Sequence, residues 1–383
     1  MLRSRRLLVG AVAVEGRIGG LGTAPDLRSV ARRRSRSSEP ASCRDYLGRV
    51  WLWSTVALTL SALGTAVVLA PPASAAPVRG LGWLLVLGSS VHVASTGWLY
   101  TVGEVREHVR DHRGRYVWAP VGLIGASAIT AALVTPSALA WLLLPYFAWQ
   151  FFHFQKQNLG MAALAASSYG LSSLRKGERR LIMLAGLAGI VGLMTRPALL
   201  QLRVDPGFGA LFWSAALVFA IAVAIGLGLL ALRAPQDRPA EFCAVYVTSL
   251  VFSLPVFLFR SPYAAVGGMT IAHGLQYLLL LSLVAYGEGR GRPSATRLVT
   301  IVLLLNVAVI GGLLLAAASH LHNAPTTGRL LFGAYLGVVM AHFVVDAGLW
   351  RLRDAFPRRF LAARIPYLVP QGPVADRSSP GID

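Results

Sequence analysis

Long apolar runs alternate with short polar segments from about residue 50 to residue 350. A helix needs about 20 apolar residues to cross the roughly 30 Å hydrocarbon core of a bilayer. The runs have this length and predict spans over residues 50–70, 81–103, 117–136, 138–157, 180–196, 209–232, 241–259, 263–286, 297–317 and 329–350. The pattern therefore predicts an all-α fold, a polytopic transmembrane helical bundle of about ten spans.

The polar segments between these runs differ in charge, and the difference predicts topology. Segments after even-numbered spans are rich in basic residues, as in 104-EVREHVRDHRGR-115 and 175-RKGERR-180, whereas segments after odd-numbered spans carry few. Basic loops of membrane proteins stay on the cytoplasmic side. We therefore expect both termini to be cytoplasmic and the even-numbered spans to run in one direction, toward the cytoplasm.

The same pattern divides the chain into three regions. Residues 1–47 are rich in Arg, Ser and Gly without periodicity, which predicts a disordered basic cytoplasmic arm. Residues 48–352 form the transmembrane helical domain, and residues 353–383 form a cytoplasmic tail. The stretch 70-APPASAAP-77 resembles a signal-peptidase site, but the long arm before it favours an uncleaved anchor.

Composition agrees with a membrane protein. Hydrophobic residues make up 55% of the chain and charged residues 14%, with a mean hydropathy of +0.60, whereas soluble domains carry about 25% charged residues. The net charge of +20 lies mostly in the arm, the loops and the tail and belongs to no soluble module. We therefore expect the lipid bilayer, and no nucleic acid, as a partner.

Residue usage narrows the chemistry and the compartment. Two cysteines without a CxxC motif exclude a disulfide framework and a cysteine metal cluster. Lysine supplies only two of the 36 basic residues, and alanine is abundant. This usage is typical of a GC-rich bacterial genome, so we expect a multi-pass protein of the bacterial inner membrane.

Four of the eight histidines fall inside predicted spans, and all four of these spans are even-numbered. They are His92, His153, His273 and His342, on the second, fourth, eighth and tenth spans. At 1.5 Å per residue, their depths differ by roughly 8 Å or less. Ionisable side chains in lipid usually face the bundle interior and mark function. We expect the four imidazoles to converge on one site, although each could instead hydrogen-bond a neighbouring helix.

Other polar residues share helix faces with these histidines. Asp346 lies one turn after His342, where it could ligate a metal or accept a ring N–H. It could equally pair with Arg351 or Arg353. Gly274 would permit close helix approach beside His273. The residues expected to support the site are Gln150, Gln157, Gln276 and Tyr277.

Neutral imidazole binds iron, zinc and copper, and four histidines with a carboxylate suit non-haem iron with an open position. The sequence thus predicts a metal-dependent oxidoreductase or oxygenase acting on a hydrophobic small-molecule substrate. The predicted metal ligands are His92, His153, His273, His342 and Asp346. Zinc would accept the same ligands. Non-covalent bis-histidine haem and a transporter or proton pathway with His and Asp relays remain open as alternatives.

Two family patterns bear on this prediction. The stretch 108-HVRDH-112 matches the HxxxH box of membrane desaturases, but the further HxxHH boxes are absent and a solvated loop is expected. Single histidines scattered over membrane helices resemble the layout of the Brp/Blh-type β-carotene dioxygenase family, which implies iron and carotenoid cleavage. The stretches 153-HFQKQN-158, 273-HGLQY-277 and 342-HFVVDAGLWRLRD-354 look more like marks of a separate family of multispanning bacterial proteins with intramembrane histidines.

Overall fold

The computed structural model describes residues 41–72, 77–169, 171, 174–288 and 294–369, and this part of the chain is helical and contains no strand. Contacts divide the chain into Met1–Cys43 and Arg44–Asp383, and the packing below is that of the second unit. Residues 1–40 and 370–383 lie outside the described residues. They include most of the predicted arm and part of the predicted tail.

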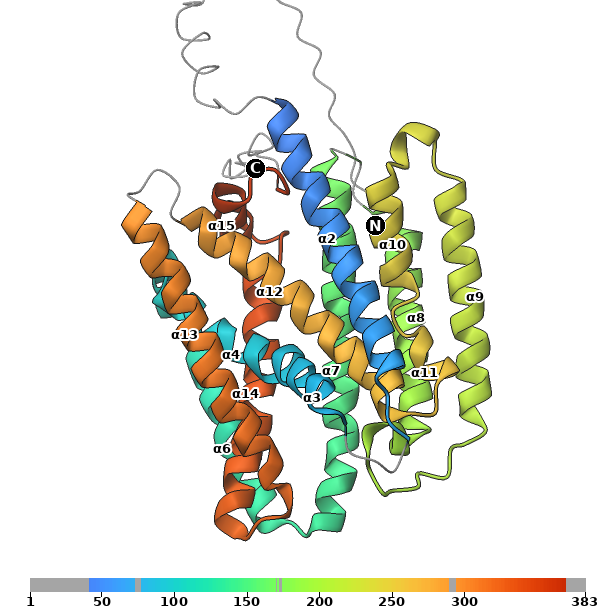
Figure 1. The fold of residues 1–383 in the computed structure, drawn as a ribbon, viewed down its shortest axis with the longest axis vertical. Helices are drawn as coiled ribbons and strands as arrows, with labels where there is room; N and C mark the ends of the chain where they lie inside the picture. Colours follow the sequence, from blue (N-terminus) through green and yellow to red (C-terminus); the bar gives the residue numbers. More distant parts are fainter. Residues whose placement is uncertain (1–40, 73–76, 170, 172–173, 289–293, 370–383) are drawn as a thin grey trace, which may run out of the picture. The chain divides into compact units, whose positions relative to one another are not determined.

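Helices cover most of each predicted span, and α5 and α15 form outside those spans. Figure 1 shows their arrangement. In chain order they are α2 (Ala41–Val68), α3 (Arg79–Val86), α4 (His92–Ser95), α5 (Gly103–Asp111), α6 (Ala119–Leu133), α7 (Pro136–Ser168), α8 (Lys176–Met194), α9 (Leu211–Ala231), α10 (Ala240–Leu250), α11 (Leu254–Leu258), α12 (Gly268–Glu288), α13 (Ser294–Ser319), α14 (Thr326–Leu349) and α15 (Ala355–Arg364). Shorter 3₁₀ or π segments are η1 (Leu87–Val91), η2 (Thr96–Thr101), η3 (Gly114–Trp118), η4 (Pro197–Leu200), η5 (Pro235–Asp237), η6 (Tyr263–Gly267) and η7 (His320–Asn323).

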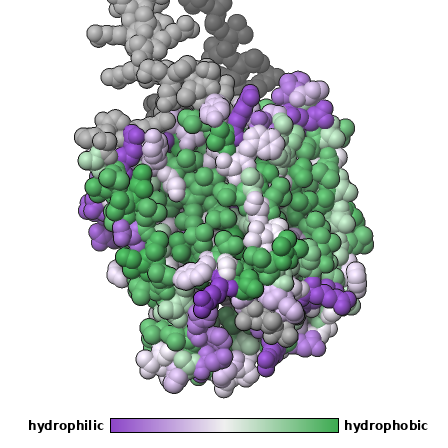
Figure 2. Space-filling view, in the orientation of Figure 1, coloured by the Kyte–Doolittle hydropathy of each residue, from purple (hydrophilic) through white to green (hydrophobic). Residues whose placement is uncertain are grey.

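Six helical segments are long and apolar enough to cross a membrane. They are Tyr46–Val68, Gly114–Leu133, Leu211–Ala231, Tyr263–Glu288, Ala295–Asn323 and Thr326–Leu349. Their outward side chains are largely hydrophobic, and Figure 2 shows such side chains covering most of the visible face. The chain is therefore a multi-pass helical membrane protein.

Two predicted spans are not single helices, and a third is longer than expected. The span 241–259 breaks between α10 and α11, because Pro255 has no backbone N–H to continue the helix. The span 81–103 changes from α to π geometry before His92 and to 3₁₀ geometry after Ser95. Helix α7 continues past residue 157 to Ser168 through a run of small residues.

Close packing against α6 fixes α14, which carries two of the predicted ligands. A Cβ atom on Gly333 would lie 2.3 Å from the carbonyl oxygen of Ser127, and one on Gly337 would lie 2.4 Å from the Cα of Ile124. Glycines four residues apart let helix backbones approach closely in membranes. The two helices therefore lie side by side (Figure 1).

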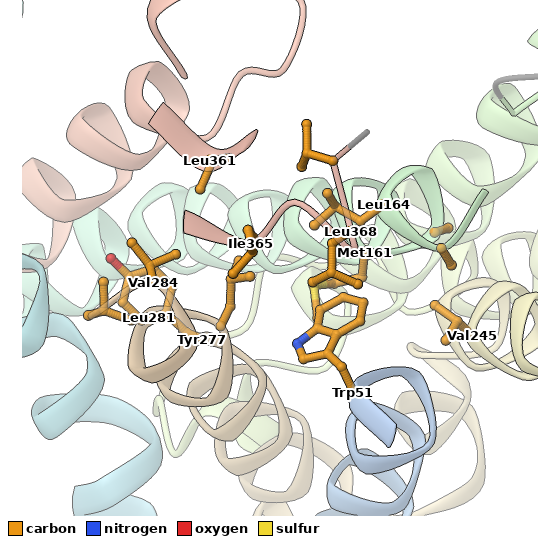
Figure 3. Close-up of a cluster of buried hydrophobic side chains, with 14 of the residues drawn as sticks. Trp51, Met161, Leu164, Val245, Tyr277, Leu281, Val284, Leu361, Ile365 and Leu368 are labelled. Atoms are coloured by element: carbon orange, nitrogen blue, oxygen red, sulfur yellow. The ribbon is translucent and has the colours of Figure 1, made fainter. Parts of the chain in front are cut away.

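The first part of the predicted tail packs into the bundle. Leu361 and Ile365 are buried in one hydrophobic cluster with Tyr277 of α12 (Figure 3). Arg364 is buried beside them and forms an ion pair with Glu288 at the end of α12. The C-terminal segment therefore helps to hold α12, which carries another predicted ligand.

Candidate metal centre

The four intramembrane histidines meet in a closed four-sided arrangement, called here the four-histidine cluster. The ring centroid of His92 lies 4.9 Å from that of His273 and 5.1 Å from that of His342. The centroid of His153 lies 5.1 Å from that of His273 and 5.0 Å from that of His342. Their exposed fractions lie between 1% and 9%. The structure thus brings all four predicted ligands together.

Two glycines account for the short distance between His92 and His273. A Cβ atom on Gly88 would lie 2.5 Å from the Cα of Ile271, and one on Gly274 would lie 2.4 Å from the carbonyl oxygen of Gly88. The π segment η1 therefore contacts α12 backbone to backbone. π turns inside helices are frequent at functional sites, and this one ends immediately before His92.

Most ring nitrogens of the cluster have no partner within the described part of the chain. The unpartnered atoms are Nδ1 and Nε2 of His92, Nδ1 and Nε2 of His273, Nε2 of His153 and Nε2 of His342. A buried polar atom without a hydrogen bond costs about 1–3 kcal/mol, and native proteins contain few of them. Six such atoms in one place could hold a metal ion.

Asp346 adds a carboxylate to the cluster. Its Oδ2 lies 3.5 Å from Nε2 of His342 and 3.9 Å from Nε2 of His153. Two sets of three ligand atoms lie within 4.8 Å of one another: His92, His273 and His342, and His153, His342 and Asp346. All five predicted metal ligands therefore belong to one buried group.

The predicted arginine partners of Asp346 are engaged elsewhere. Nε of Arg351 lies 3.8 Å and Nε of Arg353 lies 3.9 Å from the carboxylate of Asp354. In the described part of the chain, the ion-pair contacts of Asp346 are with histidines. The alternative of an arginine salt bridge to Asp346 is therefore not realised.

A hydrogen-bonded chain links His342 to Asp346 through two hydroxyl groups. Nδ1 of His342 lies 2.7 Å from Oγ1 of Thr96, which lies 2.8 Å from the hydroxyl of Tyr277. That hydroxyl donates to Oδ1 of Asp346 at 3.1 Å. Tyr277 was expected to support the site, whereas Thr96 had no predicted role.

The three glutamines make no hydrogen bond to an imidazole ring among the described residues. Gln157 donates to the backbone carbonyl of His273 and to Oε1 of Gln276, both at 3.0 Å. Gln276 donates to Oγ1 of Thr59 at 2.8 Å. Oε1 of Gln150 has no partner in this part of the chain. Gln157 and Gln276 therefore hold the helices around the cluster.

Aromatic rings cover two of the imidazoles. Phe154 stacks on His273 with centroids 4.0 Å apart, and Phe343 stacks on His153 at 4.5 Å. Phe343 also contacts Trp149 at 5.7 Å, and Trp149 is 37% exposed on the hydrophobic surface. Phe343 and Trp149 thus connect His153, the most exposed of the four histidines, to the hydrophobic surface.

The HxxxH pair lies apart from the centre. His108 stacks on Phe356 with centroids 4.0 Å apart, and the ring of His112 lies 4.3 Å from that of His108. Burial and His112 lower the pKa of His108 below its ordinary value. No described third ligand joins this pair in a metal-binding group.

Comparison of the chain with protein-family models, with curated proteins and with solved structures finds no match. The resemblance to the Brp/Blh-type family thus rests on the placement of histidines alone. Function is inferred below from the chemistry of the four-histidine cluster and of Asp346.

Proposed function

We propose that this chain is an integral membrane oxidoreductase with one non-haem iron ion, acting on a lipophilic substrate. One observation carries the proposal: four buried imidazoles face one another, and six of their nitrogens have no hydrogen-bond partner among the described residues. Neutral imidazole is the commonest protein ligand of iron, zinc and copper. Bound iron would supply redox chemistry at a position open to substrate.

The donor atoms favour a single metal ion. His342 belongs to both groups of potential ligands, but its Nδ1 is engaged by Thr96, so only Nε2 is available. One ring nitrogen binds one ion. In a square with sides near 5 Å, each centroid lies about 3.5 Å from the middle, which suits a metal–nitrogen bond of about 2.0–2.1 Å.

The charge of Asp346 also favours a cation. A buried carboxylate without a compensating charge is costly, because it loses its hydration. Asp346 has no lysine or arginine partner among the described residues, and its exposed fraction is 5%. A bound divalent ion would compensate this charge and become the largest charge of the site.

Among the alternative cofactors, iron suits these ligands best. A porphyrin held between two of the imidazoles would overlap the other two, because neighbouring centroids are only 4.9–5.1 Å apart. Structural zinc usually takes four ligands, whereas this site offers five. A proton or ion pathway needs a series of relays, and the groups here gather at one point.

The surroundings support a lipophilic substrate. Phe154 and Phe343 cover two of the imidazoles, and Trp149 connects Phe343 to the exposed hydrophobic surface. The side of the cluster nearest to the lipid is therefore aromatic and carries no charge. These surroundings favour an apolar substrate over an ionic one.

We further infer ten crossings, with both termini on the cytoplasmic side of a bacterial inner membrane. Three ion pairs support this topology, because each joins segments that the charge pattern assigns to the cytoplasmic side. Glu178 before the fifth span pairs with Arg233 after the sixth. Arg364 in the tail pairs with Glu104 after the second span and with Glu288 after the eighth.

Elemental analysis and visible spectroscopy of the purified full chain test the proposal. We expect stoichiometric iron, no Soret band, and a reversible spectral change on reduction and reoxidation. His273→Ala should abolish stoichiometric binding while the protein still inserts, whereas His320→Ala, at an exposed position outside the cluster, should retain it. A Soret band would favour haem, and redox-silent zinc would overturn the oxidoreductase. Unchanged metal content in His273→Ala would overturn the site itself.

A further inference from the structure

A chain of three hydrogen bonds joins three helical segments beside the cluster, and the backbone of α14 closes it into a loop. Thr96 comes from η2, Tyr277 from α12, and both His342 and Asp346 from α14. The distances around the loop are 2.7, 2.8 and 3.1 Å. All four residues are at least nine-tenths buried, so bulk water does not compete for these bonds.

The direction of one bond fixes the directions of the other two. The hydroxyl of Tyr277 donates its single proton to Oδ1 of Asp346. The oxygen of Tyr277 must then accept the proton of Thr96. With its own proton used, Oγ1 of Thr96 can only accept, and Nδ1 of His342 must donate.

We infer that Thr96 and Tyr277 are positioning residues that hold His342 as its Nδ1–H tautomer and leave two donor atoms free. The lone pair of His342 then lies on Nε2, and the free carboxylate oxygen is Oδ2 of Asp346. These two atoms lie 3.5 Å apart, on the side facing the other histidines. The inference deepens the proposed function, in which both residues are metal ligands.

The fixed tautomer keeps both ligands of α14 available to a metal, although they lie one turn apart. Without the loop, the two side chains could bond each other through Nε2–H and Oδ2, and both donor atoms would be lost to a metal. Ligating histidines commonly donate their other ring N–H to a partner that fixes the tautomer. Here that partner is a hydroxyl that takes its own orientation from Tyr277.

The tautomer can be measured in the metal-free chain by solid-state NMR with labelled histidine. His342→Gln identifies the signal of His342 by its loss. We expect the Nδ1–H form in the wild type, a shift toward the Nε2–H form in Thr96→Val, and the wild-type signal in Thr96→Ser. Thr55→Val is the matched control, because Thr55 is equally buried but donates only to its own helix, at Trp51, 2.9 Å away.

Metal affinity provides the second readout. Loss of a partner that orients a ligand typically lowers affinity by about 10- to 100-fold. We expect such a loss for iron in Thr96→Val and in Tyr277→Phe, and near wild-type affinity in Thr96→Ser. The double variant should lose no more than either single one, because both changes break the same loop.

The two readouts separate this inference from the proposed function. An Nε2–H signal for His342 in the wild type, which needs no variant to fold, would overturn the inference. So would a signal unchanged in both Thr96→Val and Tyr277→Phe. Iron that fails to bind a wild type with the Nδ1–H signal would overturn the proposed function, and the assignment of the tautomer would stand.

Discussion

Two buried polar groups in this helical unit differ in how their hydrogen bonds are satisfied. Glu178 accepts from Nε and Nη2 of Arg233 at 2.6 and 2.5 Å and from the backbone N–H of Arg175 at 2.9 Å. The guanidinium also stacks over Phe242, 4.7 Å from the ring centre. The four-histidine cluster is also buried, yet six of its nitrogens have no partner in the described residues.

The difference separates a structural role from the ligand-binding role that we propose for the cluster. The ion pair joins the start of α8 to the end of α9 and leaves neither charge alone. The cluster leaves its donor atoms free, an arrangement that costs stability unless a ligand is bound. Burial of polar side chains alone therefore does not indicate function in this protein, whereas the satisfaction of their hydrogen bonds does.

Breaking the ion pair should have the largest effect on stability. Arg233→Met leaves the carboxylate of Glu178 buried and unpaired, which should lower the free energy of unfolding by about 3–5 kcal/mol. Thermal unfolding in detergent, followed by circular dichroism, measures this loss. Replacing both Glu178 and Arg233 by Met should restore most of it, because no buried charge then remains.

An ion pair with an exposed arginine provides the control for this prediction. Nε of Arg49 lies 4.0 Å from Glu241, and the side chains are 61% and 14% exposed. Such surface pairs contribute about 0–1 kcal/mol, so Arg49→Met should change stability little. Equal losses in Arg49→Met and Arg233→Met would contradict the structural role assigned to the buried pair.

A smaller effect is expected where the backbone of η1 meets α12. Gly88→Ala would place a Cβ atom 2.5 Å from the Cα of Ile271, and overpacking of this kind costs about 1–3 kcal/mol. The shift would also separate His92 from His273, so metal affinity should fall although no ligand is removed. Gly125→Ala is the control, since nothing lies within 4 Å of the added atom. An unchanged metal affinity in Gly88→Ala would show that the contact between η1 and α12 does not position the ligands.

The sequence predicts the helices well, because apolar runs report directly on the lipid-facing surface. It predicts their interruptions less well. Pro255 marks the break between α10 and α11, but no comparable signal marks the π segment before His92. That change of geometry depends on the contact between Gly88 and α12, which joins residues far apart along the chain.

The candidate site is predictable for the same reason, and its support is not. His92, His153, His273 and His342 stand out because each interrupts an apolar span at similar depth. Thr96 does not stand out in the sequence, because a threonine in a membrane helix usually bonds its own backbone. In the structure, its hydrogen bonds instead join three helical segments.

The charge pattern of the sequence does not predict the buried ion pair of Glu178 and Arg233. Glu178 and Arg233 lie in segments that the sequence assigns to basic cytoplasmic loops, where charged side chains are normally solvated. Their exposed fractions are 0% and 2%. Only the packing of α8 against α9 brings the two together, and no spacing along the chain indicates that pair.

The smallest predicted effect is also the sharpest test of the comparison between the cluster and the ion pair. Loss of a cluster histidine should not lower the stability of the metal-free chain, whereas loss of the ion pair should. In the metal-free chain, His92→Leu replaces unpartnered nitrogens with an apolar side chain, so stability should be unchanged or rise by up to about 1 kcal/mol. Iron at 100 times its dissociation constant should stabilise the wild type by about 2.7 kcal/mol, and the variant far less. His320→Leu, exposed and outside the cluster, should respond to iron as the wild type does.

Melting temperatures with and without iron measure both differences. A loss of stability in metal-free His92→Leu as large as that in Arg233→Met would mean that His92 supports the fold in the same way as the ion pair, and the distinction between the two groups would fail.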